Sequence, residues 1–90
     1  MPTLAAKNAL VSMWPLLFEA RNRQLSEVEL RELRRLCDVL THKLPERYDF
    51  NAKAESLCSS IHSSGLLDRG RVEIADRLLT QVDELRGMLG

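Results

Sequence analysis

Two cysteines and two histidines carry the side chains best suited to chemistry: Cys37, His42, Cys58 and His62. Thiolate and imidazole are ligands that zinc prefers, usually four of them in a tetrahedron. Cys58 and His62 share a helix face, whereas Cys37 and His42 lie about 140° apart around a helix. The spacing matches no standard zinc finger. If the chain forms a helical hairpin that turns near Arg47, the two cysteines face each other at apolar positions, where cysteine acts as a small hydrophobic residue. We therefore expect that the two cysteines pack in the core and that the protein binds no metal. The alternative is a helical domain that is stapled by zinc.

The rest of the sequence contains no motif that resembles a catalytic site. There is no Gly-x-Ser-x-Gly element and no known signature of a cysteine enzyme. The serines at positions 56, 59, 60, 63 and 64 cluster on one predicted helix face, where solvated polar residues are ordinary. Because no acid, base and nucleophile come together in the pattern, we expect a protein that is not an enzyme and that has no cofactor.

Arginines form two groups that could contact phosphates. The groups are Arg31, Arg34 and Arg35, and Arg69, Arg71 and Arg77. Residues 25–36 resemble the opening helix of a LuxR-type helix-turn-helix, but the segment that follows is acidic and serine-rich, unlike a basic recognition helix. Glu27 with Arg31, and Glu73 with Arg77, have the i,i+4 spacing of a solvated helix face. The 13 basic residues are balanced by 13 acidic ones, so a dimeric nucleic-acid-binding regulator is the alternative rather than the leading hypothesis.

The composition is that of one small globular domain, residues 1–90. Apolar residues make up 44% of the chain and charged residues 29%, which does not favour disorder. Two cysteines are too few for a secreted disulfide scaffold, so we expect a reducing, cytoplasmic location. The apolar run at 9–18 is interrupted by Pro15 and is shorter than the roughly 20 residues of a membrane span. We therefore expect no membrane association.

The clearest helix signal begins at Ser26. Ser26 and Glu29 form a capping box, and Leu25 with Leu30 matches a hydrophobic staple. Apolar residues then follow a 3-4 spacing until Pro45, at Leu30, Leu33, Cys37, Leu40 and Leu44. A similar seam near the C-terminus comprises Val72, Ala75, Leu78, Val82, Leu85 and Leu89. Such seams are typical of helices that pack lengthwise on another helix, in the same chain or in a second copy.

The C-terminal helix, which contains the second seam, begins near an N-cap at Asp68. Two further helices complete the predicted fold. One of them covers about 51–64 and ends in a turn at Gly65. The first segment, about 3–22, is apolar over roughly half its circumference, more than the 100° that one packing face needs. Pro15 within it removes a backbone donor. We predict an all-α fold, a small antiparallel bundle of three to four helices, with the first helix kinked or broken at Pro15.

The wide apolar face of the first segment contains the residues that we expect to bind a partner: Leu10, Met13, Trp14, Leu17 and Phe18. Aromatic residues dominate the binding energy of many interfaces. The competing interpretation is that Trp14 only fills the core. The sequence thus favours a non-enzymatic protein-binding module, of a regulatory, inhibitory (antiactivator-like) or co-chaperone kind. It would sequester an apolar surface of another protein or pair with a second copy as a homodimer.

Overall fold

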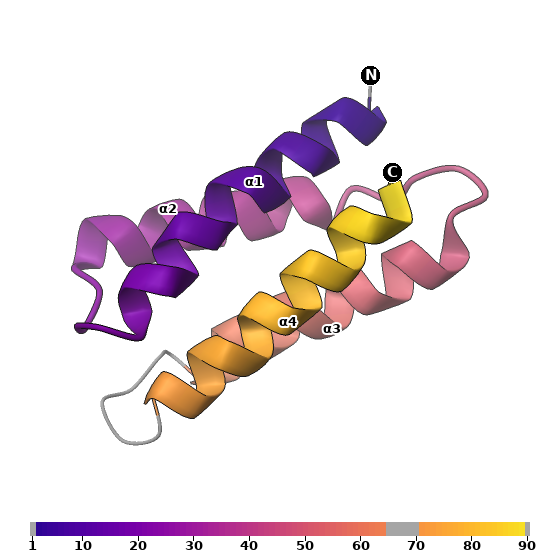
Figure 1. Ribbon diagram of the computed structural model, residues 1–90. Helices are drawn as coiled ribbons and strands as arrows, with labels where there is room; N and C mark the ends of the chain where they lie inside the picture. Colours follow the sequence, from indigo (N-terminus) through magenta and orange to yellow (C-terminus); the bar gives the residue numbers. More distant parts are fainter. Residues whose placement is uncertain (1, 65–70, 90) are drawn as a thin grey trace.

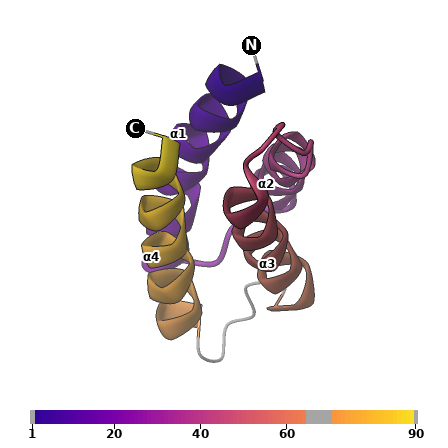
Figure 2. The ribbon, with the colours of Figure 1, turned by 90° about the vertical axis from the view of Figure 1, so that its right-hand side faces the viewer.

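A computed structural model describes residues 2–64 and 71–89, and these residues form four helices and no strand (Figure 1). The helices are α1 (Pro2–Ala20), α2 (Glu27–Leu40), α3 (Tyr48–Ser64) and α4 (Arg71–Leu89). Helix α1 packs on α2 and α4, and α3 packs on the same two helices. The chain runs up and down, so both of its ends lie at one end of the bundle (Figures 1 and 2). The predicted all-α antiparallel bundle is confirmed.

One hydrophobic core joins all four helices. The two predicted seams line it, since Leu33, Cys37 and Leu40 of α2 are buried, as are Ala75, Leu78, Val82 and Leu85 of α4. Phe50, which the sequence analysis did not assign to the core, is also buried in α3. The middle of each seam is thus covered by the chain's own helices, whereas Val72 is 45% exposed and Leu30 and Leu89 are only partly buried.

Cys37 and Cys58 face each other across α2 and α3, as the hairpin geometry predicts. The Sγ of Cys58 lies 3.6 Å from the carbonyl oxygen of Cys37, and both thiols are free and buried. The adjacent Cys58 thiol raises the pKa of the Cys37 thiol, and burial raises it further. These cysteines therefore act as core residues that hold the α2–α3 hairpin together.

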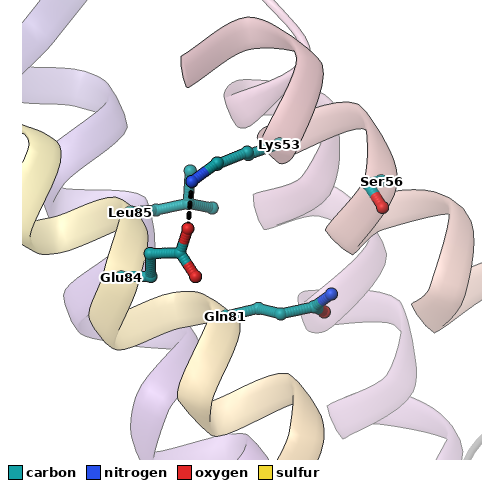
Figure 3. Close-up of a pocket in the computed structure, with 5 residues that line it drawn as sticks. All are labelled: Lys53, Ser56, Gln81, Glu84 and Leu85. Carbon is teal, nitrogen blue, oxygen red and sulfur yellow. Dashed lines mark hydrogen bonds and ion pairs between the residues drawn. The ribbon is translucent and has the colours of Figure 1, made fainter. Parts of the chain in front are cut away.

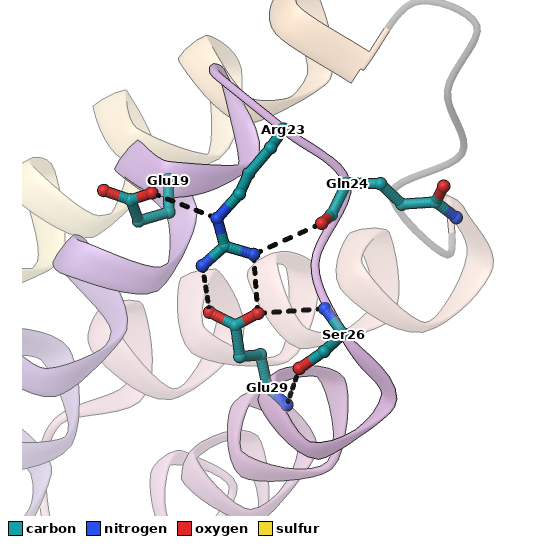
Figure 4. A network of polar contacts seen from close by, with 5 residues as sticks. All are labelled: Glu19, Arg23, Gln24, Ser26 and Glu29. Atoms are coloured by element: carbon teal, nitrogen blue, oxygen red, sulfur yellow. Dashed lines mark hydrogen bonds and ion pairs between the residues drawn. The ribbon is translucent and has the colours of Figure 1, made fainter.

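The start of α2 is fixed by the predicted capping box (Figure 4). The Oγ of Ser26 accepts from the backbone N–H of Glu29 at 3.3 Å, and the Glu29 carboxylate accepts from the N–H of Ser26 at 2.9 Å. Arg23 donates two hydrogen bonds to the same carboxylate, at 2.8 and 2.6 Å, and reaches Glu19 of α1. The Arg23 and Ser26 hydrogen bonds lower the pKa of Glu29 to about 2. One carboxylate thus ties the end of α1 to the start of α2.

The connection between α2 and α3 begins and ends earlier in the chain than the sequence predicts. Helix α2 ends at Leu40, before the expected stop at Pro45, and α3 begins at Tyr48 rather than near residue 51. Leu44 stays buried because the Asn51 side chain accepts from its N–H and donates to its C=O, both at 3.0 Å. The predicted cap at Asp68 and the turn at Gly65 lie outside the described residues.

Helix α1 is continuous through Pro15, so the break that was one of the two expected outcomes does not occur. A kink stays a prediction. Both Pro15 and Val11, four residues earlier, are exposed. The hydrogen bond that proline cannot donate therefore lies on the solvent side, where water can satisfy the Val11 carbonyl. Among the described residues, no helix combines the length and hydropathy that crossing a membrane requires.

Candidate protein-binding surface

The five residues predicted to bind a partner do not form one surface. Leu10, Met13 and Leu17 are fully buried and belong to the core, whereas Trp14 is half-buried and Phe18 is 39% exposed. The physical reason is the position of α1, which packs on two neighbours and so buries a broad part of its circumference. The width of the apolar stripe therefore reflects two intramolecular contacts, and only its remaining edge faces solvent.

That solvent-facing edge is a row of apolar residues along the outside of α1. Leu4 is 58% exposed and Val11 46%, and together with Phe18 they recur every seven residues. Trp14 lies between Val11 and Phe18, three residues after one and four before the other. We call Leu4, Val11, Trp14 and Phe18 the outer row. Its 3-4 spacing is that of a helix seam. The sequence shows this spacing, but only the structure shows that Leu4 and Val11 face solvent.

The aromatic end of the outer row is held in place by a chain of contacts. The rings of Trp14 and Phe18 stack with centroids 5.1 Å apart and planes 13° from parallel. The guanidinium of Arg21 lies 5.7 Å from the centroid of the Phe18 ring and also pairs with Asp76 of α4 at 2.8 Å. Stacking contributes about 0.5–1.5 kcal/mol beyond area burial. An exposed aromatic pair that is ordered in advance loses little entropy on binding.

The charges near the outer row are few. Within α1 the only charged residues are Lys7 and Glu19. Lys7 is exposed and falls between Leu4 and Val11 in the 3-4 spacing, while Glu19 pairs with Arg23 at 3.3 Å. The outer row itself contains no acidic side chain. The surface is therefore apolar with a basic residue in line.

The zinc alternative is not supported by the positions of its four candidate ligands. Cys37 and Cys58 meet in the core, but His42 and His62 are exposed. Within the part of the chain that the structure describes, no three histidine, cysteine, aspartate or glutamate side chains gather as a metal-binding group. The Nδ1 of His42 lies 2.9 Å from the carbonyl oxygen of Asp38, a contact local to the end of α2.

Two of the three arginines on α2 pair with neighbouring carboxylates. Arg31 pairs with Glu27 at 3.6 Å, and Arg35 makes a two-pronged contact with Glu32. Arg69 lies outside the described residues. Because these pairs neutralise much of the charge on α2, its arginines do not form an uncompensated basic surface for phosphates.

A hollow of about 210 Å³ lies between α3 and α4 (Figure 3). Lys53, Ser56, Gln81, Glu84 and Leu85 line it. Lys53 and Glu84 form an ion pair across it, and the Oε1 of Gln81 is buried without a protein partner. Small-molecule pockets usually measure about 300–1,000 Å³, so this hollow suits an ordered water better than a substrate.

Comparison with known proteins identifies no relative of this chain. No protein-family model matches the chain, and no curated protein and no solved structure is significantly similar to it. The outer row is thus identified by its exposure, its spacing and its ordered aromatic pair.

Proposed function

We propose that this chain is a non-enzymatic protein-binding domain that docks through the outer row of α1 onto an apolar surface of a partner protein. The observation that carries the proposal is the stacked Trp14–Phe18 pair, which remains partly exposed at the end of a 3-4 row. The role is regulatory, inhibitory or co-chaperone-like, because covering a partner's apolar surface blocks whatever else that surface binds.

The dimensions of the outer row suit recognition of one helix or groove. From Leu4 to Phe18 the row extends about 21 Å at 1.5 Å per residue. Helix-in-groove recognition uses anchors at i, i+3, i+4 and i+7, and Val11, Trp14 and Phe18 have this spacing. Tryptophan is among the residues most enriched at interface hot spots. We expect Trp14 and Phe18 to contribute most of the binding energy.

We assign the domain to the cytoplasm. Cys37 and Cys58 are free thiols in contact within the core, and such a pair keeps its reduced form most readily in a reducing compartment. The supporting observation is that the two free thiols are buried next to each other.

The test is a pull-down of tagged wild type, Phe18→Ala and Tyr48→Ala from lysate of the native host. Tyr48 is an aromatic residue that is 79% exposed on α3, away from the outer row, so its variant is the matched control. We expect a partner, identified by mass spectrometry, that wild type and Tyr48→Ala retain and Phe18→Ala loses.

The lysate is divided into two halves, and one half is treated with nuclease before the pull-down. Equal retention by Phe18→Ala would contradict the proposal. Recovery of nucleic acid, or loss of the partner after nuclease treatment or at moderate salt, would instead favour the nucleic-acid-binding alternative, because phosphate contacts weaken steeply with salt.

A further inference from the structure

Two thiols lie next to each other in the core, and the proposed function does not use them. Cys37 of α2 and Cys58 of α3 are 21 positions apart in the chain, and both are buried and free. The Cys58 thiol donates to the carbonyl oxygen of Cys37 at 3.6 Å. A disulfide requires two cysteines on facing parts of the backbone, with side chains that point toward each other. The α2–α3 hairpin provides this arrangement.

We propose that Cys37 and Cys58 form a redox modification site, at which a small hydroperoxide converts the two thiols into a disulfide that joins α2 to α3. This inference goes beyond the proposed function, because it needs neither the outer row nor a partner protein. Disulfides of cytoplasmic proteins are transient and commonly report an oxidising condition. The disulfide form is then a second, reversible covalent state of the same fold.

The reaction takes two steps, written here for hydrogen peroxide. The Cys58 sulfur attacks one peroxide oxygen, the O–O bond breaks, and the thiol proton leaves with the other oxygen as water. Cys58 is now a sulfenic acid. The Cys37 sulfur then attacks the Cys58 sulfur, the S–O bond breaks, and the hydroxyl group leaves with the Cys37 proton as a second water. The two thiols have lost two electrons in total, and the peroxide has gained them.

The two cysteines differ in which one reacts first. The adjacent Cys37 thiol lowers the pKa of the Cys58 thiol, whereas the pKa of Cys37 is raised. The thiolate is the nucleophile, so Cys58 attacks the peroxide and Cys37 resolves the sulfenic acid. Within the part of the chain that the structure describes, no polar or charged residue is buried in the core to compete with Cys37 for this step.

Burial restricts which oxidant can reach the sulfur atoms. Cys37 is fully buried and Cys58 is 3% exposed, so a reagent reaches them only when part of the hairpin opens. Cys37 lies in the last turn of α2, and its carbonyl oxygen also accepts from the N–H of Thr41 at 3.0 Å. Helix ends fray, and such local opening costs less than global unfolding. An opening of one turn admits hydrogen peroxide but excludes a bulky disulfide such as oxidised glutathione.

The disulfide should stabilise the domain, because it closes a loop in the unfolded chain. A link between residues 21 positions apart removes conformational freedom mainly from the unfolded state. In a chain of this size we expect oxidation to raise Tm by roughly 10–20 °C. By linkage, the native fold must favour the disulfide over the two thiols by the same factor, relative to the unfolded chain.

The first experiment exposes the native protein to hydrogen peroxide and follows its intact mass and its Tm. We expect a loss of two hydrogen atoms within one chain, the higher Tm, and complete reversal by dithiothreitol. The same oxidising equivalents of oxidised glutathione should react at least about tenfold more slowly.

Two variants identify the order of attack. Cys37→Ala retains the first nucleophile and lacks the resolving thiol, so its sulfenic acid should persist and be trapped by dimedone. Cys58→Ala retains only the less acidic thiol and should be trapped far more slowly. Neither variant should lose two hydrogen atoms.

The second experiment needs no variant and so does not depend on whether a substituted core folds. The equilibrium between the two thiols and the disulfide is measured in a dithiothreitol redox buffer, once in native conditions and once in urea. We expect the native fold to favour the disulfide at least about tenfold more than the unfolded chain does.

Several results would overturn the redox site. They are no loss of two hydrogen atoms after peroxide, a disulfide between two chains, a lower Tm for the oxidised protein, or an equilibrium no more favourable in the native state than in urea. Equal rates with peroxide and oxidised glutathione would overturn the assignment to a small oxidant. None of these results concerns the outer row, which Phe18→Ala tests separately.

Discussion

Truncation should destabilise the domain much more at one residue of α1 than at its neighbour. Leu17 is fully buried and Phe18 is 39% exposed. Leu17→Ala removes three carbons from the core, worth roughly 2.4 kcal/mol at about 0.8 per methylene, and the cavity left behind raises the cost to about 3–4 kcal/mol. Phe18→Ala loses the stacking with Trp14, worth about 0.5–1.5 kcal/mol, and the contact with the Arg21 guanidinium, worth about 0.5–1 kcal/mol. Alanine's better helix propensity partly offsets this loss. We expect a cost of about 1–2 kcal/mol.

The assay is urea unfolding followed by far-ultraviolet circular dichroism and by Trp14 fluorescence, so that coincident transitions test two-state behaviour. Small domains have about 5–15 kcal/mol of stability in total. In a chain of this size each kcal/mol lowers Tm by about 4–8 °C. Leu17→Ala should therefore lower Tm by roughly 12–30 °C, whereas Phe18→Ala should lower it by roughly 4–16 °C.

This comparison has a clear failing result. If Phe18→Ala destabilises the domain as much as Leu17→Ala, the Phe18 ring is a core residue and the outer row is not free for binding. If Leu17→Ala costs less than about 1 kcal/mol, α1 does not pack as the structure shows. In either case the assignment of core and surface on α1 would be wrong.

Three further predictions concern the polar contacts and the thiols. Asn51→Ala should lower the free energy of unfolding in urea by about 1–3 kcal/mol, because it leaves the N–H and C=O of Leu44 without partners. A loss below about 0.5 kcal/mol, which is typical of ordinary surface substitutions, would contradict this prediction. Glu29 has its pKa lowered from 4.5 to about 2, so its contribution is complete above pH 4.5 and is lost as pH falls toward 2. Glu29→Gln should flatten that part of the Tm–pH curve, and an unchanged slope would refute the assignment. Cys37 and Cys58 should react with iodoacetamide far more slowly in the native state than in urea, since both are buried; equally fast native labelling would show an open core.

Several features follow from local patterns and so could be predicted from the sequence. The capping box at Ser26 depends on residues three apart, and the structure has both of its hydrogen bonds. The two seams have a heptad spacing, and most of their residues lie in the core, although Val72 is exposed. The apposition of Cys37 and Cys58 follows from their equal distance from the turn. Each of these depends on helix periodicity or on a short hairpin, which sequence spacing determines.

The sequence predicts the end of α2 and the start of α3 less well, because their positions depend on the hydrogen bonds of one side chain, that of Asn51. Asn51 binds both main-chain groups of Leu44, and this allows α2 to end at Leu40 while Leu44 remains buried. No local signal in residues 40–50 marks this bridge. Helix ends depend on whichever partner satisfies their free backbone groups, and that partner is chosen by the tertiary fold.

The sequence by itself determined that α1 is apolar over half its circumference, because side-chain type and helical geometry are both local properties. Only the tertiary structure decided which part of that face is core and which is surface. Leu10, Met13 and Leu17 face α1's neighbours, while Leu4, Val11 and Phe18 stay exposed. The physical reason is that burial depends on where α2 and α4 lie around α1, and no spacing within α1 carries that information.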